Sequence, residues 1–302
     1  MIINNIQIDD TFAEAFNMRA TRVILTAQNL KWAYHAANAM TGFATSVIGC
    51  GVEAGIEGEL AETETPDGRP GVSVLLFAMG SKVLMQQLET RMGQCVLTCP
   101  TAAAFSGINS DDQINLGKNL RFFGDGFQTS KLIKDKRYWR VPVMDGEFLC
   151  EETTGMVRAI GGGNFLILAT SQSLALAAAE VAVEAMKKIP NVIMPFPGGV
   201  VRSGSKVGSK YKTMFASTND AFCPTLKGVT NSELSAEIES VMEIVIDGLS
   251  FEDIASAMRV GITAICQLGE SSGVKRISAG NYGGKLGPHH FKLQEIMQAD
   301  NA

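Results

Sequence analysis

An internal duplication is the feature that most constrains the fold of this 302-residue chain. The segment VILTAQNLKWAYHAANAM begins at Val23, and ILATSQSLALAAAEVAVE begins at Ile167. Both consist of an apolar run typical of a buried strand, followed by polar residues and then by apolar residues at helical spacing. The residues matched without a gap are Thr26 with Thr170, Gln28 with Gln172, Leu30 with Leu174 and Ala33 with Ala177. We therefore expect one strand–helix–strand unit in each half of the chain.

A second segment of the same kind occurs in each half, over residues 72–98 and 242–267. Two such units give four strands and two helices, which is the composition of a ferredoxin-like split β-α-β lobe. The predicted fold class is therefore α/β, of the α+β kind, with two similar ferredoxin-like lobes. The N-terminal lobe is expected to span residues 1–150 and the C-terminal lobe residues 151–302.

The two halves differ in the long segments that interrupt them. In the first half a strand is expected over residues 44–50 (ATSVIGC), followed by a glycine-rich connection up to residue 71. In the second half the corresponding segment covers residues 196–225. A hairpin is predicted over residues 138–152, with Asp145–Gly146 in its turn. Long ordered loops on a rigid scaffold are common positions for binding residues.

Composition excludes several broad classes of protein. The chain is 46% hydrophobic and 19% charged, with a formal net charge of −5, which indicates a globular protein and argues against general nucleic-acid binding. The most apolar helical stretch is interrupted by Glu180 and Glu184 and is too short to span a membrane. The first residues lack the basic and apolar regions of a signal peptide. A cytoplasmic location is therefore expected.

The cysteines and histidines do not suggest a metal site or a nucleophilic triad. The six cysteines are scattered, and the only close pair, Cys95 and Cys99, has no second pair nearby to complete a zinc site. Reduced, buried thiols are the expected state. His35 lies among alanines of a predicted helix, and the adjacent His289 and His290 cannot easily share one metal ion.

The stretch FPGGVVRSGSKVGSK, residues 196–210, has the composition of an anion-binding loop. It does not match a P-loop, because Ser205 precedes Lys206 after the second glycine. The GGGNF stretch at residues 161–165 precedes a predicted strand, so it is not a dinucleotide fingerprint either. Backbone N–H groups, serine hydroxyls and lysine ammonium groups of the loop could still hold a carboxylate or phosphate. The alternative is a mobile basic surface loop.

Glu243 is the strongest candidate for chemistry, because all its neighbours within two residues are apolar. A carboxyl group in such a strand is expected to be partly desolvated, which raises its pKa toward neutrality. The position that matches it in the first half is taken to be Ser73, so the fold itself does not require a carboxylate there. The alternative is a structural ion pair with an arginine.

The chain resembles formylmethanofuran:tetrahydromethanopterin formyltransferase along essentially its whole length. The motifs that carry the resemblance are DDTFAEAF at 9–16, MTGFATSVI at 40–48, TPDGRPGV at 65–72, FFGDGF at 122–127, FPGG at 196–199, SGSKVGSK at 203–210, ASTNDAFCPT at 216–225, EIVIDGL at 243–249 and ISAGNYGGKLG at 277–287. The segments of residues 20–48 and 72–91 resemble the versions from methylotrophic bacteria more closely than those from methanogens.

The resemblance implies a fold of two related α/β lobes and a homo-oligomer, usually a tetramer. It implies transfer of a formyl group between the amine of methanofuran and N5 of tetrahydromethanopterin, with both carriers as co-substrates and no bound cofactor or metal. Both carriers have anionic tails, which the lysine-containing loop could bind. In methylotrophs the enzyme is one subunit of a formyltransferase/hydrolase complex, so hydrolase subunits are possible partners, while nucleic acid and membrane are not expected.

The resemblance also implies site residues. Glu243 matches the position proposed to act in acid–base chemistry during direct transfer in a ternary complex. The expected substrate-binding residues are Ser205, Lys206, Ser209, Lys210, Asn219, Asp220, Asn281, Gly283, Gly284 and Lys285.

Three other functions are weighed against this one. The chain could be a non-catalytic scaffold subunit of a hydrolase complex, but retention of Glu243 and of the glycine-rich loops speaks against that. It could release formate itself, although no metal constellation is evident in the sequence. It could also transfer acyl groups to amines on another carrier.

Overall fold

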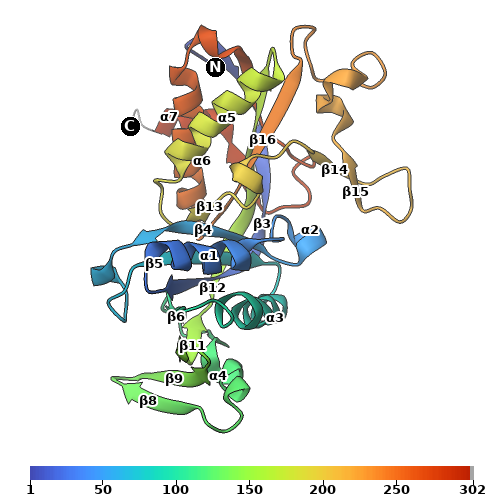
Figure 1. Cartoon of the computed structure of the whole chain (residues 1–302). Helices are drawn as coiled ribbons and strands as arrows, with labels where there is room; N and C mark the ends of the chain where they lie inside the picture. Colours follow the sequence, from blue (N-terminus) through green and yellow to red (C-terminus); the bar gives the residue numbers. More distant parts are fainter. Residues whose placement is uncertain (300–302) are drawn as a thin grey trace. The chain divides into compact units, whose positions relative to one another are not determined.

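The computed structural model describes residues 1–299, and the chain divides into two compact units (Figure 1). Unit 1 contains Met1–Asn17 and the chain from Ile160 onward, and unit 2 contains Met18–Ala159. The chain passes between the units within two long strands, β3 (Phe12–Thr26) and β12 (Val157–Ala169). Relative to the expected lobes 1–150 and 151–302, unit 1 also contains residues 1–17 and unit 2 also contains residues 151–159. The expected boundary between the lobes stays a prediction.

Unit 2 contains the predicted strand–helix–strand repeat. Its elements are the second half of β3, α1 (Leu30–Thr41), β4 (Glu53–Leu60), β5 (Gly71–Ala78), α3 (Ser81–Arg91) and β6 (Ala103–Ser106). The strands lie in the order β4-β5-β3-β6, and every neighbouring pair is antiparallel. This is the strand order of a ferredoxin-like lobe. Both helices pack into one core with Val23 and Leu25 of β3.

The strand expected over residues 44–50 is wrong. Val47–Cys50 form the short helix α2, and the strand follows as β4 inside the expected glycine-rich connection. Polar groups at the start of α2 decide the outcome, because Ser46 accepts a hydrogen bond from the N–H of Ile48 and Glu53 accepts one from the N–H of Val47. The helix ends at Gly51, whose φ of 77° suits a residue without a Cβ atom.

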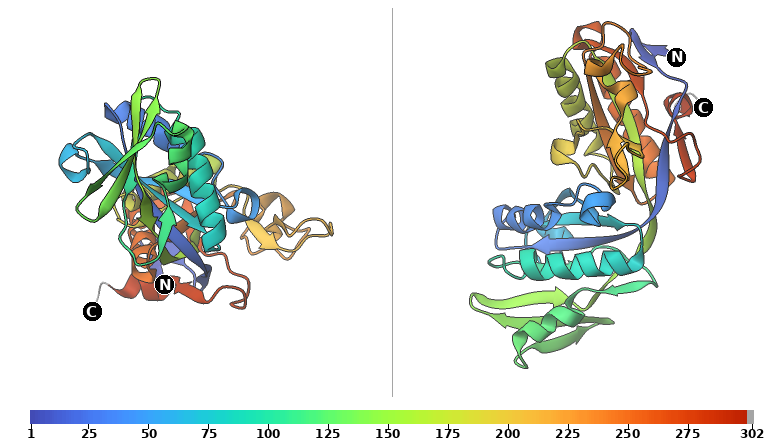
Figure 2. Two further views of the ribbon diagram at one scale, coloured as in Figure 1. Left: turned by 90° about the horizontal axis from the view of Figure 1, so that it is seen from below. Right: turned by 90° about the vertical axis from the view of Figure 1, so that its right-hand side faces the viewer.

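Further strands extend unit 2 beyond β6 (Figure 2). The predicted hairpin is present, since β9 and β10 are antiparallel and meet at Val143 and Gly146, but its turn consists of Met144–Asp145 and not of Asp145–Gly146. β10 is parallel to β6, and β8 pairs with the other edge of β9. The remaining elements of the unit are β7 (Gln113–Asn115), α4 (Gly117–Leu120), β8 (Thr129–Ile133), β9 (Lys136–Val143), β10 (Gly146–Glu151) and β11 (Thr153–Gly155).

Unit 1 repeats the same topology. Its elements are β12, α5 (Gln172–Met186), β13 (Val192–Ile193), β16 (Ser240–Gly248), α6 (Phe251–Gln267) and β17 (Val274–Ser278). The strand order is β13-β16-β12-β17, again antiparallel throughout. The two predicted ferredoxin-like lobes are thus confirmed. Strand pairing also corrects one match, because Leu166 lies opposite Glu243 whereas its counterpart Arg22 lies opposite Leu75, not Ser73.

Short elements complete the edges of unit 1. β1 (Ile2–Ile3) pairs with β2 (Ile6–Ile8), and β2 continues the sheet parallel to β17. β18 (His289–Lys292) is antiparallel to the first residues of β3 and leads into α7 (Leu293–Gln298). The segment from Phe12 to Ala15 is thereby paired with β18, the strand that follows the loop of residues 279–287.

Helices α5 and α6 lie side by side against β16 on one face of this sheet (Figure 1). Close packing requires glycine at several points. A Cβ atom on Gly163 would lie 2.5 Å from Ile254 of α6, and one on Gly261 would lie 2.5 Å from Met186 of α5. The GGGNF stretch is therefore part of β12, where it forms a bulge under α6 and does not precede the strand as expected.

Residues 194–239, which we call the excursion segment, begin beside α5 and continue onto the opposite face of the sheet. It contains the short hairpin β14 (Ser205–Val207) and β15 (Ala216–Thr218). Phe222 and Leu234 of this segment pack against Leu166, Leu168 and Val241 of the sheet. No helix within residues 1–299 is both long and apolar enough to cross a membrane.

Candidate active site

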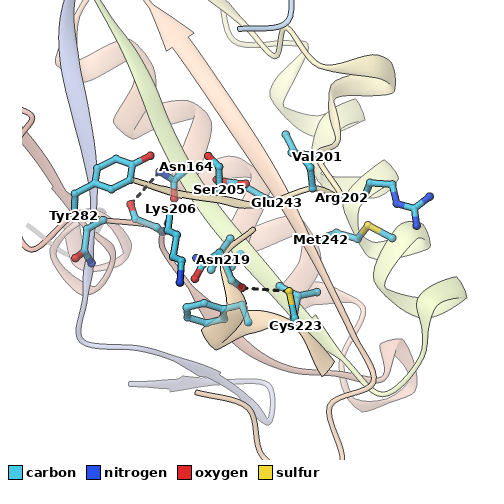
Figure 3. Close-up of a pocket in the computed structure, with 17 residues that line it drawn as sticks. Asn164, Val201, Arg202, Ser205, Lys206, Asn219, Cys223, Met242, Glu243 and Tyr282 are labelled. Carbon is cyan, nitrogen blue, oxygen red and sulfur yellow. Dashed lines mark hydrogen bonds between the residues drawn. The ribbon is translucent and has the colours of Figure 1, made fainter. Parts of the chain in front are cut away.

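A pocket of about 110 Å³ lies in unit 1 between β16, the excursion segment and the loop of residues 279–287, which we call the glycine loop (Figure 3). Its polar lining comes from these three segments and from β12. The residues with polar side chains are Asn164, Arg202, Ser203, Ser205, Lys206, Asn219, Cys223, Glu243, Asn281 and Tyr282. The volume suits the reacting end of a substrate and is too small for a whole carrier molecule.

Glu243 is held at the base of this pocket by strand pairing. It lies opposite Leu166 of β12 and forms a two-bond bridge with Val201, with N···O distances of 2.9 and 2.7 Å. Side chains alternate along β16, so Ile244 turns into the helix-covered core while Glu243 turns to the pocket. In the sheet, Glu243 therefore lies between two apolar residues, Leu166 on one side and Val201 on the other.

This environment changes the acidity of Glu243. Burial raises the pKa of its carboxyl group to about 7, because the charged form loses water and gains little in return. No group within residues 1–299 donates a hydrogen bond to the carboxylate, and no arginine forms an ion pair with it. The structural ion pair considered from the sequence is therefore absent from the described residues. A carboxyl group with this pKa can both give and take a proton at neutral pH.

The glycine loop is held by a second buried carboxylate, that of Glu14 in β3. One of its oxygens accepts hydrogen bonds from the N–H groups of Tyr282 (2.7 Å) and Gly284 (2.8 Å), and the other from Leu286 (2.5 Å) and Gly287 (2.7 Å). Burial alone would raise the pKa of Glu14, but these four hydrogen bonds outweigh it and lower the pKa. Glu14 thus stays ionised and fixes the loop.

Asn164 holds the start of the same loop. Its side-chain amide donates to the carbonyl of Gly280 (3.1 Å) and accepts from the N–H of Gly280 (2.6 Å). Asn281 donates to the carbonyl of Phe12 (3.2 Å). With both ends bound in this way, the loop places the ring of Tyr282 at the wall of the pocket (Figure 3).

The excursion segment supplies the cationic wall. Lys206 of β14 forms an ion pair with Asp220, and its hydrogen bond lowers the pKa of that carboxyl group. The ammonium group of Lys206 is therefore already neutralised by a neighbour. Arg202 also lines the pocket, and it makes no ion pair with another residue in the described part of the chain.

The predicted binding residues are brought together only in part. Ser205, Lys206, Asn219 and Asn281 line the pocket with Glu243, and Asp220 adjoins them through Lys206. The others lie outside the lining; they are Ser209, Lys210, Gly283, Gly284 and Lys285.

Internal contacts occupy several of these outer groups. Ser209 accepts a hydrogen bond from the N–H of Tyr211, and the N–H of Gly283 is bound by the side chain of Asn281. The N–H of Gly284 is bound by Glu14. Substrate contacts at all ten positions stay predictions.

The residues of the site that were not among those predicted from sequence include Tyr282, Asn164 and Glu14. Tyr282 stands within the quoted motif ISAGNYGGKLG, so its position was visible although its role was not. Glu14 lies in a segment, DDTFAEAF, whose alternation marks a strand, and a glutamate on the buried face of such a strand is a signal that could have been used. Asn164 gave no comparable signal.

Metal-ligating side chains do not gather anywhere in residues 1–299 in groups of three or more. The pocket itself offers one carboxyl group of raised pKa, a phenol, amides, hydroxyls, a thiol and cationic side chains. Such a set can position two polar substrates and move a proton between them.

Comparison with known proteins gives matches over nearly the whole chain. The family model of formylmethanofuran-tetrahydromethanopterin formyltransferase matches residues 1–143, and the model of the proximal lobe of the same family matches residues 146–296. The formylmethanofuran–tetrahydromethanopterin formyltransferase of Methylobacillus flagellatus is 77% identical over 301 residues, which cover 98% of this chain and all of that protein.

Two solved structures are similar in fold and sequence. The formyltransferase/hydrolase complex of Methylorubrum extorquens, determined with methylofuran, contains a chain that matches with a TM-score of 0.96 and 52% identity, covering 98% of each chain. The formyltransferase of Methanosarcina barkeri matches with a TM-score of 0.93 and 49% identity, covering 98% of this chain and 100% of that one. The higher identity to the protein from Methylobacillus than to that from Methanosarcina agrees with the expected bacterial type.

Proposed function

The chain belongs to the formylmethanofuran-tetrahydromethanopterin formyltransferase family and is a formyltransferase, and we propose that it transfers formyl directly between its two carriers with Glu243 as the acid–base group. The carriers, methanofuran and tetrahydromethanopterin, are substrates of this activity. The observation that carries the proposal is the position of Glu243, a carboxyl group with a pKa of about 7 that faces a pocket lined by polar groups.

The reaction requires two proton movements that one such group can perform. The amine of the incoming carrier attacks the formyl carbon, and a tetrahedral intermediate with an oxyanion forms. Glu243 in its protonated form gives its proton to the leaving nitrogen or stabilises the oxyanion, and as a carboxylate it takes the proton that the attacking nitrogen loses. A carboxyl group with its usual pKa would be ionised at neutral pH and would have no proton to give.

The cationic wall of the pocket supports binding of carriers with anionic tails. Arg202 and Lys206 both line the pocket, and Ser205, Asn219 and Asn281 add hydrogen-bonding groups. The ion pair between Lys206 and Asp220 suggests that Arg202 attracts an anion more strongly than Lys206. Ser209, Lys210, Gly283, Gly284 and Lys285 are proposed to contact parts of the carriers that extend beyond the pocket.

The partners proposed for the chain are copies of itself and hydrolase subunits. The family resemblance favours a homotetramer in the cytoplasm. One relative, from Methylorubrum extorquens, is named as a subunit of a formyltransferase/hydrolase complex and is 53% identical over 98% of this chain. By analogy, this chain would pass formyl from the pterin to methanofuran for release as formate.

Substitution Glu243→Gln tests the proposal. Glutamine keeps the size and the hydrogen bonds of the protonated side chain but cannot transfer a proton, so kcat should fall by about 10²- to 10⁴-fold while KM changes little. The matched control is Glu237→Gln, a change at an exposed position shortly before β16. Unchanged kcat in Glu243→Gln would remove the acid–base assignment, whereas absence of transfer by both the wild type and the variant would favour the scaffold-subunit alternative.

A further inference from the structure

We propose that Tyr282 is a second catalytic residue, whose hydroxyl group donates a hydrogen bond to the oxyanion of the tetrahedral intermediate while Glu243 moves the protons. The proposal rests on the formyl transfer proposed above, in which Glu243 was given both proton transfer and stabilisation of the oxyanion. Here Glu243 keeps the proton transfer, and Tyr282 stabilises the oxyanion. It begins from the placement of the phenol in the same small pocket as Glu243 (Figure 3).

The ring of Tyr282 is fixed in place from the backbone side. Its N–H is bound by Glu14, and the residues on both sides are held, Gly280 by Asn164 and Gly284 by Glu14. Because the glycine loop has two successive residues with positive φ, Gly283 (77°) and Gly284 (70°), it turns sharply back after Tyr282. A group whose backbone is so constrained is positioned before the substrate arrives, as oxyanion stabilisation requires.

The Ser205 hydroxyl lines the same pocket as the phenol of Tyr282 and can donate to the phenol oxygen. When Ser205 donates to that oxygen, the O–H of Tyr282 is left to donate to a group in the pocket. Burial and the nearby Glu243 raise the pKa of Tyr282, so the phenol stays protonated and remains a donor throughout the cycle.

The step balances without any other reactant. The lone pair of the incoming amine forms the new C–N bond, and the π electrons of the formyl C=O move to its oxygen, where the O–H of Tyr282 stabilises the charge without giving up its proton. Glu243 gives a proton to the leaving nitrogen, the old C–N bond breaks and the C=O bond re-forms. Glu243 then regains a proton from the nitrogen that attacked.

Glu14 acts in this scheme as a positioning residue. It does not line the pocket, yet its four hydrogen bonds determine where the glycine loop lies. Loss of these bonds would displace the Tyr282 ring from the oxyanion while leaving Glu243, on β16, in place.

Kinetics of Tyr282→Phe test the inference. Removal of one oxyanion donor should lower kcat by about 10²- to 10³-fold while KM stays within about threefold. The control is Tyr34→Phe, which removes a tyrosine hydroxyl bound to Glu59 in unit 2. Undiminished kcat in Tyr282→Phe with a strong loss in Glu243→Gln would overturn the role of Tyr282 alone, whereas undiminished kcat in both would overturn the proposed function as well.

The combination of Glu14→Gln with Tyr282→Phe tests the positioning role. If Glu14 acts through Tyr282, Glu14→Gln should lower kcat in the otherwise unchanged protein and have almost no further effect on kcat when residue 282 is phenylalanine. Two losses that simply multiply would show that Glu14 acts independently of the phenol and would overturn its positioning role.

Discussion

At the scale of single residues, the environment of Glu243 is the central observation. Leu166 and Val201 flank it in the ladder, and burial raises its pKa to about 7. The apolar neighbours within its own strand were visible in the sequence and led to the expectation of a raised pKa. The contact with Val201 could not be seen in the sequence. Val201 belongs to the excursion segment, 42 residues before Glu243, and reaches it only through a β-bridge.

The pH dependence of kcat should report this pKa. If the protonated form of Glu243 is required, kcat is full below pH 7 and declines as pH rises through about 7. This fall of kcat with rising pH should be missing in Glu243→Gln, whose residual rate should vary little with pH. Steady-state kinetics with saturating carriers would measure this fall in kcat between pH 5.5 and 8.5, which is about 1.5 pH units on either side of the pKa. A flat wild-type profile would contradict the assignment.

At the scale of elements, the glycine loop and the excursion segment show where sequence patterns stop being informative. Apart from β4, the strands and helices of both repeats follow from apolar spacing, and the helix starts at Ser171 and Ser250 follow from side-chain capping. The conformation of the glycine loop depends on Glu14, about 270 residues away, so no local pattern predicts it. The strand expected at residues 44–50 failed for a local reason, the capping of α2 by Ser46 and Glu53.

Glu14 should also contribute strongly to stability. Its pKa is lowered in the folded state, so its contribution is fully present above the pKa of the unfolded chain and is lost as pH falls through the lower folded value. Glu14→Gln leaves two N–H groups facing an amide nitrogen, which should cost about 2–4 kcal/mol at pH 7.

Urea unfolding of Glu14→Gln, with Glu295→Gln as a control at an exposed i,i+3 pair, would measure this difference. The difference between wild type and Glu14→Gln should shrink toward acid pH. A loss of stability below about 0.5 kcal/mol at neutral pH would mean that the glycine loop is held by other contacts.

At the scale of the whole molecule, the duplication was the most informative feature of the sequence. Because the two repeats share residues at equivalent positions, their common strand order could be predicted before any contact was known. The sequence did not predict that the first 17 residues belong to the unit of the second repeat. This placement depends on pairing of Phe12–Ala15 with β18 at the other end of the chain. The residues of the pocket, from Asn164 to Tyr282, all belong to that one unit.

Formyl transfer by the purified chain alone tests the central claim most directly. The protein would first be checked by light scattering for a mass of about four times 32.2 kDa, as expected of a homotetramer. It would then be given formyl-tetrahydromethanopterin and methanofuran. The account predicts rapid formation of formylmethanofuran without free formate, and loss of that activity in Glu243→Gln. Absence of transfer both alone and after addition of hydrolase subunits would contradict it.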